Sequence, residues 1–225
     1  MTVSAVTSAP NITATVLSLV GGSNPSGYLQ QIQVYTDSSS FTPITNATVT
    51  INGSPVSYNA AKQSYDGNVV IAAGAAVNLS VTIGGTAYAA SGTQYIAFPG
   101  VTSPASGSTW QHANANNINW TAGAPTTAAT YFVGIANSAG NIVYQAGSNG
   151  KSGSPVNVPT STASYTVPAN SLTAGNYYLF VGIGTQGIGG ESSGGIPIPN
   201  TTGSASSPSG LWIGGIASFV PITVQ

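Results

Sequence analysis

Six side chains in this sequence carry or can take up charge near neutral pH, and they are the first candidates for chemistry. They are Asp37, Lys62, Asp66, His112, Lys151 and Glu191. General acid–base catalysis needs a carboxylate or an imidazole close to the substrate, and a zinc site needs three or four ligands. Because these residues are scattered along the chain, their spacing indicates neither arrangement. We therefore predict no enzyme, no catalytic residue, no metal site and no cofactor.

Two weak catalytic alternatives remain open. A retaining glycosidase would need the carboxyl groups of Asp37 and Asp66 about 5 Å apart. However, Asp66 precedes a glycine and Asp37 opens a run of serines, and both patterns are typical of turns. His112 could serve a serine hydrolase, but the chain has no Gly-x-Ser-x-Gly nucleophile elbow. A hydrolase using His112 or the acid pair is kept as the third alternative.

Aromatic side chains are the better candidates for ligand binding. Sugars stack their C–H faces on Trp and Tyr rings, while amides and hydroxyls orient the sugar hydroxyls. Trp120 reads as a buried strand tryptophan, whereas Trp110 and Trp212 are the candidates for exposure. The alternative is that these two cap the ends of a sandwich. The candidate ligand-binding residues are Trp110, Trp212, Tyr178 and His112.

The charge content excludes several classes of partner. Charged residues make up 2% of the chain, against about 25% in an average protein. Two lysines and no arginine cannot neutralise a nucleic-acid backbone, nor can they form a polybasic membrane anchor. No apolar run reaches the roughly 20 residues of a membrane-spanning helix, so membrane insertion is not expected. The chain has no cysteine, which excludes disulfides and thiolate sites.

A net charge of −1 gives little repulsion between copies of the chain. Glycans, tight self-association or a medium hostile to charge are the alternatives that would explain how nonspecific aggregation is avoided. Among the Asn-x-Ser/Thr sequences, Asn52 and Asn200 are the most accessible candidates for glycosylation. We expect an extracellular or cell-surface location, with no signal peptide in these residues.

Regular short strands separated by turn residues predict an all-β fold. The strongest amphipathic strand runs over residues 77–83, and Asn52-Gly53 predicts a tight hairpin. The pattern predicts two tandem immunoglobulin-like β-sandwich domains. They are residues 8–97, after a flexible start at 1–7, and residues 98–225. The second domain carries a long loop over 184–210, rich in Gly, Ser and Pro, and ends in a strand over 216–224.

The second half resembles a known family. Its proline, glycine, tryptophan and Ile-x-Trp strand are Pro104, Gly107, Trp110, Ile118 and Trp120. This pattern is similar to the Ser-Thr-rich, yeast cell-wall glucan-assembly type of immunoglobulin-like domain, which is also fibronectin type III-like. The later stretch 165–177 looks like the strand, corner and tyrosine of such domains. The resemblance implies a sandwich fold and no catalytic residue.

The first half resembles, more weakly, the carboxypeptidase-regulatory or Cna-B type of bacterial surface sandwich, through residues 47–53 and 74–88. Such modules act as stalks, spacers and binding units. Some Cna-B-type domains contain an isopeptide bond from a buried lysine. Here the resemblance would assign that role to Lys62, with Asp66 or Asp37 assisting.

These observations favour a non-catalytic extracellular binding or adhesion module. Its favoured partner is a carbohydrate or cell-surface polymer, held by aromatic stacking and neutral hydrogen bonds. The alternative is a structural subunit of a surface filament or layer that self-associates by β-strand exchange. The strand over residues 12–20 would be the donor, unless it simply begins its own sandwich.

Overall fold

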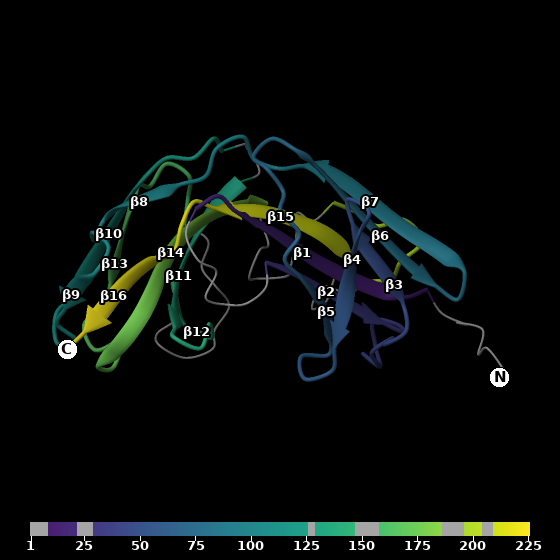
Figure 1. The fold of residues 1–225 in the computed structure, drawn as a ribbon, viewed down its shortest axis with the longest axis horizontal. Helices are drawn as coiled ribbons and strands as arrows, with labels where there is room; N and C mark the ends of the chain where they lie inside the picture. Colours follow the sequence, from purple (N-terminus) through teal and green to yellow (C-terminus); the bar gives the residue numbers. More distant parts are fainter. Residues whose placement is uncertain (1–8, 22–28, 126–128, 147–157, 186–195, 204–208) are drawn as a thin grey trace.

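The computed structural model describes residues 9–21, 29–125, 129–146, 158–185, 196–203 and 209–225 (Figure 1). These residues form strands, turns and loops. No helix long and apolar enough to cross a membrane occurs among them. The predicted all-β sandwich class is confirmed, while the predicted start at residues 1–7 lies outside the described residues.

The strands fall along the chain in the following order. The first seven are β1 (Asn11–Leu19), β2 (Gln30–Tyr35), β3 (Thr48–Ile51), β4 (Ser54–Asn59), β5 (Ser64–Gly67), β6 (Ala76–Ile83) and β7 (Thr86–Thr93). The next six are β8 (Gly100–Ser103), β9 (Ser108–Trp110), β10 (Asn116–Thr121), β11 (Ala129–Asn137), β12 (Ile142–Gln145) and β13 (Ser164–Val167). The last three are β14 (Gly175–Thr185), β15 (Gly210–Ile216) and β16 (Val220–Val224).

The first hydrophobic core lies between two layers of one folded sheet. The path β15-β1-β2-β5-β4 continues through β3 to β6 and β7. Alternate residues of these strands are buried, as in β6, where every second side chain enters the core. The tight turn at Asn52-Gly53, with φ angles of 49° and 79°, confirms the predicted hairpin between β3 and β4.

The second hydrophobic core lies between the sheet β13-β10-β8 and the strands β11, β14 and β16. Trp120 of β10 is buried there, as predicted, with its ring 5.7 Å from that of Tyr131. The hydroxyl of Tyr177 donates to the carbonyl oxygen of Thr173 at 3.0 Å. Such a bond from a tyrosine hydroxyl to the backbone a few residues upstream is the tyrosine corner that is typical of immunoglobulin-like sandwiches.

The main surprise is β15, which links the two cores. It pairs in parallel with β1, from Thr13↔Gly210 to Leu19↔Ile216. It also pairs antiparallel with β14, so one continuous sheet runs through both halves of the arch (Figure 1). Residues 98–225 were predicted to form the second sandwich, yet Leu211 and Ile213 pack in the first core.

The structure also divides the predicted loop over 184–210 and the predicted strand over 216–224 differently from the prediction. Residues 184–185 end β14, and part of the predicted loop lies outside the described residues. The predicted strand over 216–224 is two elements, because the chain leaves β15 at Ile216 and enters β16 at Val220. Ile216 therefore packs with Phe180 and away from the second core, whereas Val220 faces that core.

A buried glutamine holds the junction together. Gln94, in the connection between β7 and β8, is 2% exposed. Its Nε2 donates to Ser18 Oγ of β1 at 2.7 Å and to the carbonyl oxygen of Gly214 of β15 at 2.9 Å. Its Oε1 accepts from the backbone N–H of Tyr95 at 2.8 Å. One side chain thus fixes β1, β15 and the interdomain connection relative to one another.

Candidate functional site

The two tryptophans that were candidates for exposure are both buried, so they do not form a surface site. Trp110 is 6% exposed, because β9 pairs with β16 and turns the indole into the second core. Trp212 is 2% exposed, since every residue of the central strand β15 is buried. Neither indole offers a face for stacking a ligand.

The other two predicted binding residues lie on separate elements. His112 is exposed in the turn after β9, where its backbone N–H donates to the carbonyl oxygen of Gln225 at 2.8 Å. Tyr178 is half-buried on the face of β14 that points away from the second core, opposite Ala136 and Pro221. The structure does not bring the four residues into one site.

Both glycosylation candidates are exposed. Asn52 occupies the hairpin turn with φ 49°, and its Nδ2 donates to the carbonyl oxygen of Ala76 at 2.8 Å. Asn200 has φ 60° in the described segment 196–203. A glycan on Asn52 would replace one of the two hydrogens of the Nδ2 that bonds to Ala76.

The carboxylate of Asp37 closes a turn. Its Oδ1 accepts from the backbone N–H of Ser40 at 2.6 Å and of Ser39 at 2.8 Å. The hydroxyls of both serines add further bonds. These bonds favour the charged carboxylate and hold the pKa of Asp37 well below its ordinary value. The bond from the N–H of Ser40 contributes most, followed by the bond from the N–H of Ser39 and those from the two hydroxyls.

This turn predicts an unusual titration. A lowered folded-state pKa means that the bonds of Asp37 stabilise the fold above about pH 3.9, the unfolded value. That contribution is lost only as pH falls towards the lower folded pKa. In an NMR titration we expect Asp37 to titrate well below pH 3.9 in the folded protein and near that value in urea. Equal midpoints in the two states would contradict the turn geometry.

A row of polar side chains crosses the outer face of the first sheet. Core residues alternate with outward ones along β1, β2, β5 and β4. The strand registers place the outward residues in line: Thr15 lies opposite Gln31, Gln31 opposite Asp66, and Asp66 opposite Ser57. We call this outer surface the polar face. Its exposed or half-buried residues are Thr13, Thr15, Gln31, Gln33, Ser57, Asn59, Lys62 and Asp66, and the fully buried Ser64 lies beneath them.

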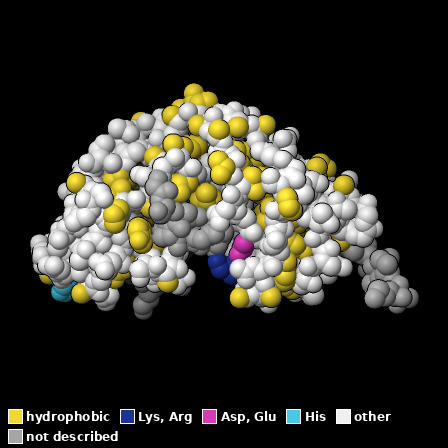
Figure 2. All heavy atoms as spheres, viewed as in Figure 1, with side chains coloured by type: hydrophobic (Ala, Val, Ile, Leu, Met, Phe, Trp, Pro, Cys, Tyr) yellow, Lys and Arg dark blue, Asp and Glu magenta, His cyan; other side chains and the backbone are white. Residues whose placement is uncertain are grey.

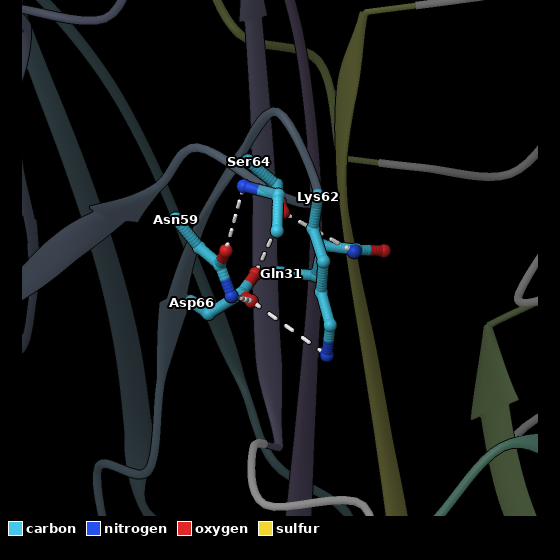
Figure 3. Close-up of polar contacts among 6 residues, drawn as sticks. Gln31, Asn59, Lys62, Ser64 and Asp66 are labelled. Atoms are coloured by element: carbon cyan, nitrogen blue, oxygen red, sulfur yellow. Dashed lines mark hydrogen bonds and ion pairs between the residues drawn. The ribbon is translucent and has the colours of Figure 1, made fainter.

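A hydrogen-bond network surrounds the carboxylate of Asp66 (Figure 3). Its Oδ1 accepts from Ser64 Oγ at 2.7 Å, and its Oδ2 accepts from Asn59 Nδ2 at 2.9 Å. Gln31 Nε2 donates to Ser64 Oγ at 3.3 Å. Lys62 Nζ lies 3.9 Å from Asp66 Oδ2. The carboxylate is therefore held in a fixed orientation from several sides.

Burial differs sharply within the network. The side chain of Asp66 is 10% exposed, whereas that of Lys62 is 41% exposed. In Figure 2 a lysine and a carboxylate meet on the flank of the hollow beneath the arch. The Cna-B-type isopeptide would need a buried lysine, and the exposure of Lys62 does not provide one. The pair instead leaves the polar face nearly neutral.

The geometry does not assemble an acid–base pair. Gln31, which pairs with Asp66, is separated from the end of β2 at Tyr35 by about 13 Å of strand, and Asp37 lies beyond that end. The described residues contain no group of three His, Cys, Asp or Glu side chains that could hold a metal ion. What the polar face presents is a set of amides and hydroxyls around one fixed carboxylate.

Sequence reasoning missed this face. The alternation in β2 places Gln31, Gln33 and Tyr35 on one side and Ile32 and Val34 on the other. Two glutamines on the outward side were a usable signal. The row itself depends on the pairing register, which the sequence does not show.

No family model matches the chain, and a search of curated proteins found no match. Among solved structures, a chimeric titin Z1Z2-Z1Z2 tandem functionalised with a GRGDS peptide from fibronectin is 14% identical, with a TM-score of 0.28. That match covers 96% of this chain and 99% of the other. Fibronectin(III)-like modules of Clostridium thermocellum CbhA are also 14% identical, with a TM-score of 0.23. This match covers 94% of this chain and 93% of the other.

These neighbours are β-sandwich proteins of the immunoglobulin-like and fibronectin III-like kinds. At such TM-scores they support no statement about function or about shared topology. No specific family is established, so the similarity to glucan-assembly domains stays a resemblance. The functional argument rests on the polar face.

Proposed function

We propose that this chain is a non-catalytic extracellular or cell-surface binding module that holds a neutral carbohydrate polymer on its polar face. The observation that carries the proposal is the row from Thr15 through Gln31 and Asp66 to Ser57, which crosses four neighbouring strands. A polymer lying across the strands would meet hydrogen-bonding groups about every 4.8 Å. Such repetition suits a chain of hydroxylated units.

The charges of the face favour a neutral ligand. Lys62 and Asp66 compensate each other at 3.9 Å, so neither a polyanion nor a polycation gains net attraction. Asp66 is a fixed acceptor because Ser64 and Asn59 hold its oxygens. A carboxylate accepting from a sugar hydroxyl forms a charge-assisted bond, roughly twice as strong as a neutral one.

An aromatic surface lies at the end of the same face. Tyr35 is on the outward side of β2, and its ring packs edge-on against Phe41 with centroids 5.5 Å apart. Phe41 is 40% exposed. We assign to this pair the stacking role that the sequence analysis gave to Trp110 and Trp212.

The structural alternative, strand exchange through β1, would carry a cost. β1 is paired with β15 on one side and β2 on the other, so an exchanging strand would first have to leave both ladders. Releasing β1 would also break the bond from Gln94 to Ser18.

The extracellular location remains part of this proposal and rests on the 2% charge content.

The test is binding to neutral polysaccharides such as glucan, mannan, cellulose and chitin. Asp66→Asn and Gln31→Ala are each expected to weaken binding by about 10-fold or more, since each removes a bond at the centre of the row. Affinity electrophoresis or pull-down with insoluble polymer measures this, with circular dichroism to confirm folding.

The matched control is Gln111→Ala, which makes the same change as Gln31→Ala at an exposed position after β9. It should bind as the unaltered protein does. Equal losses for Gln111→Ala and Gln31→Ala, or no binding to any neutral polymer, would overturn the proposal.

A further inference from the structure

The outer edge of β7 is a strand edge without a partner strand in the described part of the chain. β7 lies at one end of the sheet path and pairs only with β6. That pairing runs without interruption from Ala76↔Thr93 to Ile83↔Thr86. Such an edge presents a row of backbone donors and acceptors that another strand can use.

The backbone pattern identifies the residues that face outward. The N–H of Gln94 donates to the carbonyl oxygen of Ala75 at 2.9 Å, which continues the β6–β7 ladder. Because successive residues of an antiparallel strand alternate in direction, the even-numbered residues of β7 bond to β6. The N–H and C=O groups of Ala87, Ala89, Ser91 and Thr93 therefore point away from β6.

The usual protections of an edge strand are absent from β7. Natural edges are blocked by charge, proline, a bulge or shortness. The residues 86–93 include no Lys, Arg, Asp, Glu or Pro, and the ladder has no register shift. At the opposite end of the path, β12 has 4 residues and a register shift against β11. The contrast marks β7 as the open end of the sheet.

We propose that β7 pairs antiparallel with β7 of a second copy of this chain, about a two-fold axis at Ala90. This register places Ala89 opposite Ser91 and Ala87 opposite Thr93. It keeps Tyr88 and Ala90, which pack against the first core, on the inner side of both sheets. A slip by one residue would bring inner residues opposite outer ones.

The neighbouring surface suits a second copy. The outward side chains of β7 are small, uncharged and exposed, so two strands can approach without desolvating an ion. A net charge of −1 per chain adds almost no repulsion. Since the same patch serves both copies, the contact closes on itself and forms a dimer, not a filament.

Ala89→Pro is the decisive substitution. Proline removes an outward N–H without removing a bond to β6, so the monomer should stay folded. In the dimer the change acts twice, and we expect the dissociation constant to rise roughly 10-fold or more. Sedimentation equilibrium over a wide concentration range measures this. Ser91→Lys is a second variant that adds charge to the edge and should act in the same direction.

The control is Thr45→Lys, which adds the same charge at an exposed loop position and should leave the dimer intact. Amide exchange gives an independent signature. With rising protein concentration, protection should increase at residues 87, 89, 91 and 93 and stay constant at 88, 90 and 92. A monomer at all concentrations, or a dimer unaffected by Ala89→Pro, would overturn the proposal. Neither outcome bears on carbohydrate binding.

Discussion

Replacement of Gln94 by leucine is expected to lower the free energy of unfolding by about 3 kcal/mol or more. The leucine would leave Ser18 Oγ, the carbonyl oxygen of Gly214 and the N–H of Tyr95 without their present partner. Each buried polar group left in this way costs about 1–3 kcal/mol. The loss falls at the junction, where a single side chain holds two strands and the connection between the cores.

Thermal and urea unfolding would measure this effect. For a chain of this size, about 3 kcal/mol corresponds to a fall in Tm of about 6–12 °C. Gln111→Leu is the control, because Gln111 is exposed and its side chain makes no hydrogen bond in the described structure. It should change stability by no more than about 0.5 kcal/mol. Similar losses of unfolding free energy for both variants would show that the buried hydrogen bonds of Gln94 do not stabilise the junction.

Ile213→Asp is expected to have the larger effect and to separate the two halves of the arch. Ile213 is 2% exposed in the first core. A carboxylate placed there without a partner costs more than about 4 kcal/mol. We expect β15 to leave the core so that the carboxylate reaches water, which would also break its pairing with β1 and β14.

Small-angle X-ray scattering should then show a larger radius of gyration. Amide exchange should rise along β1 and β15, while β10 and β11, with which β15 does not pair, keep more of their protection. The control Thr109→Asp adds the same charge at an exposed position of β9. An unchanged scattering profile for Ile213→Asp would mean that β15 does not hold the halves together.

Much of the strand pattern could be predicted from the sequence. β6 alternates clearly because one face meets the core and the other meets water. The hairpins at residues 52–53 and 84–85 could be predicted because both turns need positive φ angles, which Asn and Gly tolerate.

β15 was not predicted because its residue types have a low intrinsic preference for β-strands. Three of its residues are glycines, which are depleted in strands. The structure needs at least one of them, since a Cβ at Gly215 would collide with the ring of Phe98. The run Leu211-Trp212-Ile213 was the available signal, and burial on both faces removed the alternation that marks a strand.

The functional prediction failed for a related reason. Trp110 and Trp212 were candidates for exposure, but the sequence does not show which side of a strand enters the core, and both indoles are buried. The polar face was invisible because Gln31 and Asp66 become neighbours only through the register of β2 and β5. The sequence shows which residues are polar, but only the strand pairing shows which of them lie side by side on the sheet.

The placement of β15 also governs when the protein can fold. The N–H of Ile12 bonds to the hydroxyl of Ser209, across a sequence separation of 197 residues. The first core lacks Leu211 and Ile213 until those residues have been synthesised, so residues 9–97 cannot complete that core by themselves. Such distant contacts slow folding.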